Sequence, residues 1–220
     1  MIKGVIFDFD GTLFDSMEIW SHIAYDYLTI KGIDDPHITE IVANMSMFNA
    51  LSYIKNHYHI VDDISVMNQD VKNLLYDYYA NEVKPKQGVI EFLKYLSFHH
   101  IQMIILSASS RKLIDVALSH YHMEKYFDDV LCCDELQLDK NNPQIFLLAI
   151  EKMKLLKEDV LVVEDAYHAI ETAKSIGLNV LGIYDQSEKR NIKPLVDFYI
   201  HDYQELEEYI NEKSINDCWN

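Results

Sequence analysis

The decisive stretch of this sequence is Gly4-Val5-Ile6-Phe7-Asp8-Phe9-Asp10-Gly11-Thr12-Leu13-Phe14-Asp15. Its apolar first part is typical of a short buried strand, which ends at two carboxylates, a glycine and a threonine. Because side chains alternate along a strand, Asp8 and Asp10 return to the same side beyond its carboxyl end. Two like charges so placed predict either a divalent cation or one protonated member. Gly11 permits the positive φ of a sharp turn, and Thr12 offers a hydroxyl and a backbone amide to an oxyanion.

The same string resembles the first motif of the haloacid dehalogenase (HAD) superfamily of phosphohydrolases. That motif is DxDGT, followed by an apolar residue and often by a second Asp. The match is complete from Asp8 to Thr12, and Asp15 holds the later position. The purely structural alternative is an acidic turn after a core strand, which is common for one Asp and uncommon for this whole string. The resemblance implies a Rossmann-like α/β core.

The chain is strongly acidic, with a formal net charge of -17. This charge argues against nucleic acid as a partner, because phosphate backbones require basic surfaces. An anionic substrate can approach only where local positive charge overrides the global field, which requires a bound metal, a lysine and exposed backbone amides. We therefore expect such a lysine near the carboxylates.

Length and composition suit one sizeable domain or a core domain with a smaller insertion, since 49% of the 220 residues are hydrophobic. No apolar run approaches the length of a transmembrane helix, and no signal peptide precedes the first strand. We therefore expect a cytoplasmic protein without a membrane partner, as a monomer or weak homodimer. The three cysteines have neither metal-binding nor disulfide-like spacing.

Residues 16–84 show only helical patterns. Apolar residues recur at helical spacing over 19–28 and 71–79, and Asp15 and Glu18 are spaced as a capping pair. No strand pattern interrupts this segment. It therefore reads as a helical module inserted directly after the first strand.

The insertion divides the chain into an α/β core, residues 1–15 and 85–220, and an all-helical cap, residues 16–84. Ligands of open α/β sheets bind beyond the carboxyl ends of the strands, where such an insertion would form a roof. HAD proteins with a helical C1-type cap at this position form the group that contains phosphoglycolate phosphatases and β-phosphoglucomutases. The chain resembles that group.

Outside the cap, strands and helices alternate, which predicts a doubly wound parallel sheet. Strands are expected at 5–7, 101–106, 129–133, 160–163 and 180–184, with a final edge strand at 198–200 and a closing helix at 206–210. This architecture brings dispersed strand ends to one edge of the sheet.

A second chemical motif is Ser107-Ala108-Ser109-Ser110, which follows the strand predicted at 101–106. The Ser107 hydroxyl and the following amides, beginning with Ala108, form a phosphate cradle where a helix starts. Ser109 or Ser110 is expected to cap that helix. Serines cap helices in many proteins, so the motif alone is weak evidence. It coincides, however, with the second HAD motif, a Ser or Thr that closes an apolar strand.

The lysine expected from the charge argument is Lys140, in Lys140-Asn141-Asn142-Pro143. A lone loop lysine is ordinarily a solvated surface group. In capped HAD proteins the third motif is a lysine usually followed by proline, with a second proline three residues after the lysine and an aromatic residue beyond. Lys140, Pro143 and Phe146 match this motif, whereas Asn141 departs from the first proline.

The plainest buried strand, at 160–163, ends in Glu164-Asp165. An acidic pair at a strand's end matches the fourth HAD motif. The family often continues with a small polar residue and a glycine, and Ala166 and Ala169 stand in those places here. Both substitutions keep a small side chain, so they weaken the resemblance little.

These groups predict a magnesium site, because carboxylate oxygens are hard ligands suited to Mg²⁺. The resemblance implies that Asp8, the backbone carbonyl of Asp10, and Asp165 bind the metal. Glu164 would be a further ligand, directly or through water.

The same groups predict covalent phosphoryl transfer. Asp8 would attack phosphorus to make an aspartyl phosphate, and Asp10 would donate a proton to the leaving alkoxide. Lys140 and the metal would offset charge on the phosphate oxygens, which Thr12, Ser107 and backbone amides would hold.

The sequence thus favours a Mg²⁺-dependent phosphatase acting on a small phosphorylated metabolite. The alternative is a β-phosphoglucomutase-like phosphotransferase, which must clamp a second phosphate; yet the predicted cap has no arginine, since the only two are Arg111 and Arg190. A receiver-like phosphoaspartate signalling or binding module is disfavoured, because its phosphoaspartate must be long-lived. A catalytically idle binding protein is disfavoured because every charged motif position is present.

Overall fold

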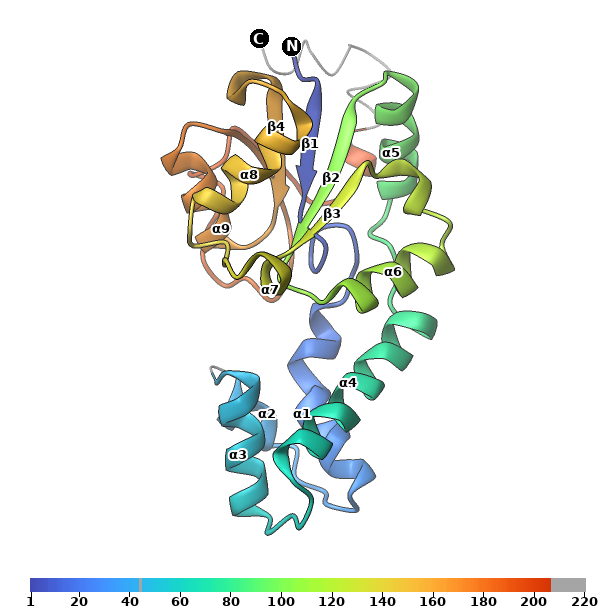
Figure 1. Ribbon diagram of the computed structural model, residues 1–220, viewed down its shortest axis with the longest axis vertical. Helices are drawn as coiled ribbons and strands as arrows, with labels where there is room; N and C mark the ends of the chain where they lie inside the picture. The colour runs from blue at the N-terminus through green and yellow to red at the C-terminus, as the bar shows by residue number, and fades with distance from the viewer. Residues whose placement is uncertain (44, 207–220) are drawn as a thin grey trace. The chain divides into compact units, whose positions relative to one another are not determined.

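The computed structural model describes residues 1–43 and 45–206 (Figure 1). The chain forms two compact units. One consists of Met1–Asp15 and the chain from Val83 onward, and the other is Ser16–Glu82.

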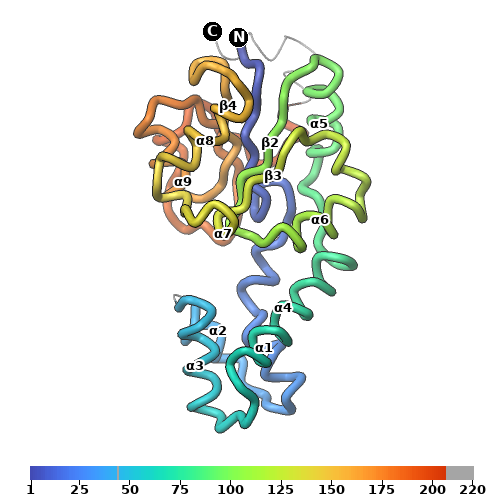
Figure 2. Tube along the Cα trace, viewed as in Figure 1, coloured from blue at the N-terminus to red at the C-terminus, as the bar shows by residue number. Residues whose placement is uncertain are grey.

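The first unit contains a six-stranded sheet in the order β3-β2-β1-β4-β5-β6, and every neighbouring pair is parallel. The strands are β1 (Gly4–Phe7), β2 (Gln102–Ser107), β3 (Asp129–Cys132), β4 (Val160–Glu164), β5 (Asn179–Ile183) and β6 (Phe198–Ile200). The chain trace places the blue amino-terminal strand between the green β2 and the orange β4 (Figure 2). The predicted parallel sheet is confirmed.

Strand β1 is buried along its whole length because both of its edges are paired and both of its faces are covered. Phe7 lies opposite Ile105 on one side and Val163 on the other. Asp8, which follows β1, therefore comes at the level of Leu106 in β2 and of Glu164 at the end of β4. This register places the functional groups.

The helices of this unit are α5 (Val89–Phe98), α6 (Arg111–His120), α7 (Cys133–Leu136), α8 (Gln144–Met153) and α9 (Tyr167–Ser175). Short 3₁₀ turns, η1 (Glu124–Tyr126) and η2 (Lys157–Asp159), precede β3 and β4. The four-residue α7 is not among the helices expected from sequence. The helix predicted at 206–210 falls almost entirely outside the described residues.

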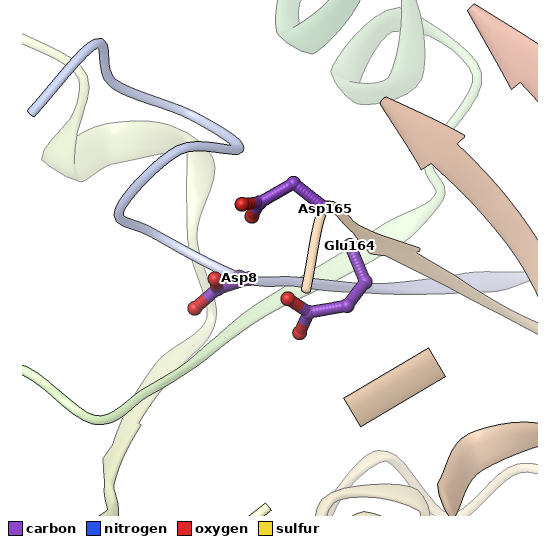
Figure 3. Close-up of side chains that lie close together, drawn as sticks. All are labelled: Asp8, Glu164 and Asp165. Carbon is purple, nitrogen blue, oxygen red and sulfur yellow. The ribbon is translucent and has the colours of Figure 1, made fainter. Parts of the chain in front are cut away.

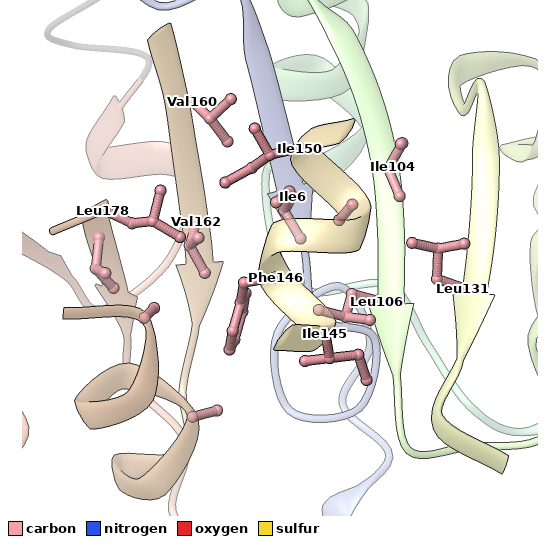
Figure 4. Packing of buried hydrophobic residues seen from close by; sticks show 14 of the residues in the cluster. Ile6, Ile104, Leu106, Leu131, Ile145, Phe146, Ile150, Val160, Val162 and Leu178 are labelled. Carbon is pink, nitrogen blue, oxygen red and sulfur yellow. The ribbon is translucent and has the colours of Figure 1, made fainter. Parts of the chain in front are cut away.

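Hydrophobic packing covers both faces of the sheet. On one face, Ile6 and Val162 pack with Phe146 of α8, within a cluster that also includes α9 (Figure 4). On the other face, the rings of Phe7 and Phe92 of α5 pack edge to face, with their centroids 6.1 Å apart. Successive residues of β1 thus point to opposite layers, as the doubly wound fold requires.

The second unit is helical, with α1 (Met17–Ile30), α2 (Ile38–Val42), α3 (Met47–His57) and α4 (Ile64–Asn81). Its core side chains come at helical spacing from α1 and α4, and Trp20 donates its indole N–H to the Tyr79 hydroxyl at 2.7 Å. The predicted Asp15–Glu18 capping pair is wrong. Ser16 holds the N-cap position without a side-chain capping bond, whereas Asp15 pairs with Lys86. Among the described residues, no helix has both the length and the apolar character needed to cross a bilayer.

Candidate active site

The carboxyl ends of the central strands carry a buried cluster of acidic groups. Asp8 follows β1, while Glu164 ends β4 and Asp165 follows it. All three side chains are buried, and one oxygen from each lies within 4.8 Å of the others. Figure 3 shows the three carboxylates turned toward a common space. The register of β1 and β4 creates this cluster, since parallel neighbours end at one edge.

Lys140 lies between two of these carboxylates. Its ammonium forms an ion pair with Asp8 and another with Glu164, the latter at 2.8 Å, and the side chain is only 6% exposed. Burial alone would lower the pKa of Lys140, but Asp8 and Glu164 outweigh it and raise that pKa. Lys140 is therefore a fixed positive charge within the acidic cluster, where the charge argument required one.

The environment of Asp8 and Asp165 disfavours their ionised forms and raises the pKa of both carboxyl groups. Burial, reinforced by Glu164 and opposed by Lys140, raises the pKa of Asp8 to about 7. Burial, together with Glu164 and Asp8, raises the pKa of Asp165 well above its usual range, against the opposing bond from Thr12. A cation bound here would relieve both carboxyl groups.

Glu164 has both oxygens committed to donors in the protein. One accepts from Lys140, and the other accepts from the backbone N–H of Ala166 at 3.1 Å. Asp8 pairs with Lys140 and Asp165 accepts the Thr12 hydroxyl, and each also offers an oxygen to the space shared by the three acids. The donor set fits a hard divalent cation held by Asp8 and Asp165.

The loop after β1 is shaped around Asp165. The Thr12 hydroxyl donates to Asp165 Oδ1 at 2.7 Å, so this side chain orients a carboxylate; the sequence had suggested that it faces an oxyanion. Gly11 has φ of 80°, and a Cβ there would lie 2.6 Å from Asp165 Oδ2. Only glycine fits this turn, because any side chain would meet the carboxylate in a backbone region that L-residues avoid.

Asp10 and the turn after β2 are joined by a hydrogen bond. The Ser109 hydroxyl donates to Asp10 Oδ2 at 2.5 Å, and the Ser109 N–H donates to Ser107 Oγ at 3.0 Å. Ala108 is exposed between these two serines. The expectation that Ser109 or Ser110 caps the following helix is confirmed for Ser110, which is the N-cap of α6, although its side chain makes no capping bond.

Two further buried residues, Lys86 and Tyr203, contact the loop that follows β1, and the sequence did not indicate either. Lys86 is buried and pairs with Asp15 at 2.8 Å and with Asp185 at 3.2 Å. The fully buried Tyr203 donates its hydroxyl to the Thr12 carbonyl at 3.2 Å. Lys86 lies in Lys84-Pro85-Lys86-Gln87-Gly88, which breaks the helical pattern, so no local pattern indicates its burial.

Comparisons with known proteins agree with this geometry. The family model of the haloacid dehalogenase-like hydrolases matches residues 5–183. The chain is 24% identical to a phosphorylated carbohydrates phosphatase from Thermotoga maritima, over 80% of this chain and 82% of that protein. It is 23% identical to the fructose-1-phosphate phosphatase YqaB of Escherichia coli, over 82% and 95%.

Solved structures show the same fold. A crystal structure of CbbY from Rhodobacter sphaeroides in complex with phosphate superimposes with a TM-score of 0.77 at 17% identity, covering 94% of this chain and 96% of that one. The β-phosphoglucomutase of Clostridium difficile gives a TM-score of 0.69 at 22% identity, covering 96% of each chain. The family model spans the sheet from β1 to β5 with all four clustered motifs, and the chain belongs to the haloacid dehalogenase-like hydrolase family.

Proposed function

We propose that the protein is a Mg²⁺-dependent phosphatase that hydrolyses a small phosphorylated metabolite through an aspartyl phosphate on Asp8. The observation that carries this proposal is the convergence of Asp8, Lys140 and Asp165 in one buried cluster at the carboxyl edge of the sheet. The phosphatase names of the relatives agree with it. Family membership alone leaves the reaction open, because one fold hosts several chemistries.

In the first step, a carboxylate oxygen of Asp8 attacks phosphorus and the bond from phosphorus to the ester oxygen breaks. Asp10 gives its proton to the departing alkoxide. In the second step, water attacks the same phosphorus, Asp10 takes back a proton, and inorganic phosphate leaves Asp8 free. A Mg²⁺ ion held by Asp8 and Asp165, with the Asp10 carbonyl as a further ligand, would supply positive charge to the phosphate oxygens.

The remaining polar groups neutralise charge on the phosphate oxygens and hold the phosphate in place. Lys140 offsets charge that builds on the equatorial oxygens, while Glu164 fixes its ammonium through a 2.8 Å bond. Ser107 accepts the Ser109 N–H, which leaves its own hydroxyl proton to donate to phosphate, beside the amide of Ala108. Because each Glu164 oxygen accepts a hydrogen bond, one from Lys140 and one from Ala166, we assign Glu164 to orienting the lysine rather than to direct metal binding.

The helical unit Ser16–Glu82 would act as the cap that selects the substrate. It contains no arginine, so the natural bidentate clamp for a second phosphate is missing from it. This composition favours release of phosphate over its transfer to a second position. A β-phosphoglucomutase-like reaction remains the alternative, and it predicts that glucose 1-phosphate becomes the 6-phosphate faster than phosphate appears.

The test is a panel of phosphorylated metabolites, assayed for released phosphate with Mg²⁺ and with a chelator. The wild-type protein should turn over at least one compound repeatedly, and only with the metal. Asp8→Asn should abolish turnover while retaining the fold, and mass spectrometry of acid-quenched wild type should find phosphate on the peptide that contains Asp8. Glu158→Gln is the matched control, because it removes one exposed carboxylate at the opposite end of β4. Substantial Mg²⁺-dependent hydrolysis by folded Asp8→Asn would refute the covalent assignment.

A further inference from the structure

The turn between β2 and α6 connects two parts of the proposed chemistry. Ser109 is only 5% exposed, although it stands among polar residues at a helix start. Its hydroxyl donates to Asp10 Oδ2 at 2.5 Å, and its N–H donates to Ser107 Oγ at 3.0 Å. One residue thus touches both the acidic loop after β1 and the hydroxyl that ends β2.

The position of Ser109 does not follow from helix capping. Ser110, not Ser109, is the N-cap of α6, so the Ser109 hydroxyl is not needed by the helix. A buried hydroxyl with no local structural duty is instead directed across the sheet edge at a carboxyl group ninety-nine residues earlier in the chain. Such a contact fixes the orientation of that carboxyl group, because the rigid turn after β2 supplies the donor.

We propose that Ser109 is a positioning residue that holds Asp10 for proton transfer to the leaving group. This inference rests on the proposed phosphatase function and adds a residue to it. The Ser109 hydroxyl binds Oδ2 of Asp10 and so fixes the orientation of that carboxyl group. Because Ser109 also binds Ser107, the proton on Asp10 is held at a fixed position relative to the Ser107 hydroxyl. Ser109 itself touches neither phosphorus nor the leaving oxygen.

A residue that acts only through the general acid has a specific kinetic signature. Cleavage of an alkyl phosphate needs a proton on the departing oxygen, whereas 4-nitrophenolate departs readily without one. Ser109→Ala should therefore lower kcat/KM strongly for an alkyl phosphate and weakly for 4-nitrophenyl phosphate. Positioned proton transfer contributes ~100-fold to 10,000-fold, so we expect the alkyl ester to lose about 10-fold or more beyond the aryl ester.

The experiment compares kcat/KM for the best alkyl substrate of the metabolite panel, phenyl phosphate and 4-nitrophenyl phosphate. This constant reports the steps up to the first irreversible one, so the later hydrolysis of the aspartyl phosphate does not mask the effect. Ser109→Thr keeps the hydroxyl and should restore the wild-type order of substrates. Ser110→Ala removes the neighbouring hydroxyl, which makes no capping bond, and should leave the three constants unchanged.

Equal losses on all three esters, or wild-type constants in Ser109→Ala, would overturn the proposal. If Ser109→Ala does not fold, Ser109→Cys offers a weak donor of similar size, and the same selective loss is expected from it. If wild type hydrolyses no phosphate ester, the proposed function fails, and a crystal structure of Ser109→Ala still decides the positioning claim. An unmoved Asp10 carboxyl group in that structure would contradict it.

Discussion

Replacing Lys86 tests whether a buried ion pair stabilises the carboxyl edge of the sheet, because its ammonium lies between the carboxylates of Asp15 and Asp185. Its side chain is 8% exposed; it pairs with Asp15 at 2.8 Å and with Asp185 at 3.2 Å, and donates to the Tyr184 carbonyl at 3.1 Å. Burial alone would lower the pKa of Lys86, but these two acids raise it, so it is charged in the folded protein. Lys86→Met keeps the stem and removes the charge.

The two ion pairs of Lys86 contribute differently to the stability of the fold. The Asp15 side chain is 59% exposed, so its pair with Lys86 should contribute no more than about 1 kcal/mol. Asp185 is 6% exposed, and stripping a buried carboxylate of its partner costs about 3–5 kcal/mol. Asp185 keeps the N–H bond from Ser187 at 2.9 Å, which places the cost near the lower end. We expect Lys86→Met to lower the stability of the first unit by about 3 kcal/mol.

The assay is native-state hydrogen exchange of the β1, β4 and β5 amides, read by mass spectrometry. Because the chain has two compact units, a single unfolding curve would mix their transitions, whereas these amides report the first unit alone. Asp185→Asn in the Lys86→Met background should recover much of the loss, since it removes the stranded charge. A loss below about 1 kcal/mol, or an Asp15→Asn variant as damaging as Asp185→Asn, would refute this reasoning.

Two further predictions concern the metal site. Gly11→Ala should lose about 2–4 kcal/mol, because it adds left-handed backbone strain to a Cβ placed 2.6 Å from Asp165, and should weaken Mg²⁺ binding in titration calorimetry. Gly177→Ala, with φ of 78° and open space around its Cβ, is the control and should show the strain alone. The second prediction is that the rise in Tm caused by Mg²⁺ grows from about pH 5 to about pH 8. Burial, and then Glu164, raise the pKa of Asp8 to about 7, so the folded protein binds this proton more tightly than the unfolded chain does. Asp8 therefore destabilises the metal-free fold increasingly as pH rises toward about 7, and the proton that competes with the metal is lost as pH passes that value. Equal Mg²⁺ shifts in Tm at both pH values would count against this, and Asp8→Asn should remove the trend.

The sheet and the acidic groups at its carboxyl edge could be predicted because the sequence patterns that indicate them are each only a few residues long. An apolar run that ends in a carboxylate, as at Phe7 and Val163, reports both burial and the strand's end within a few residues. Parallel pairing then brings these ends together without further information. For this reason Asp8 and Asp165 could be expected at one place although they are far apart in the sequence.

Contacts that depend on side-chain direction could not be predicted in this way. Lys86 lies in a break between two helical patterns, and its partners Tyr184 and Asp185 come from a distant part of the chain. Ser109 reads as a helix cap, because capping is the commonest duty of a serine at that position. Its actual partner, Asp10, follows a different strand and lies 99 residues away in the sequence. A contact between residues so far apart produces no periodic pattern from which it could be predicted.

The balance of charge at this edge connects the acidic composition to the proposed function. Three carboxylates, Asp8, Glu164 and Asp165, meet one ammonium, that of Lys140, so their fully ionised forms leave two negative charges. That remainder equals the charge of one divalent cation. Lys86 is committed to Asp15 and Asp185 and does not neutralise the cluster directly. If the proposed function holds, we expect a phosphate dianion to approach this part of a protein of net charge -17 only after a divalent cation has bound. It follows that metal should bind before substrate, and that raising the substrate concentration should not replace the metal.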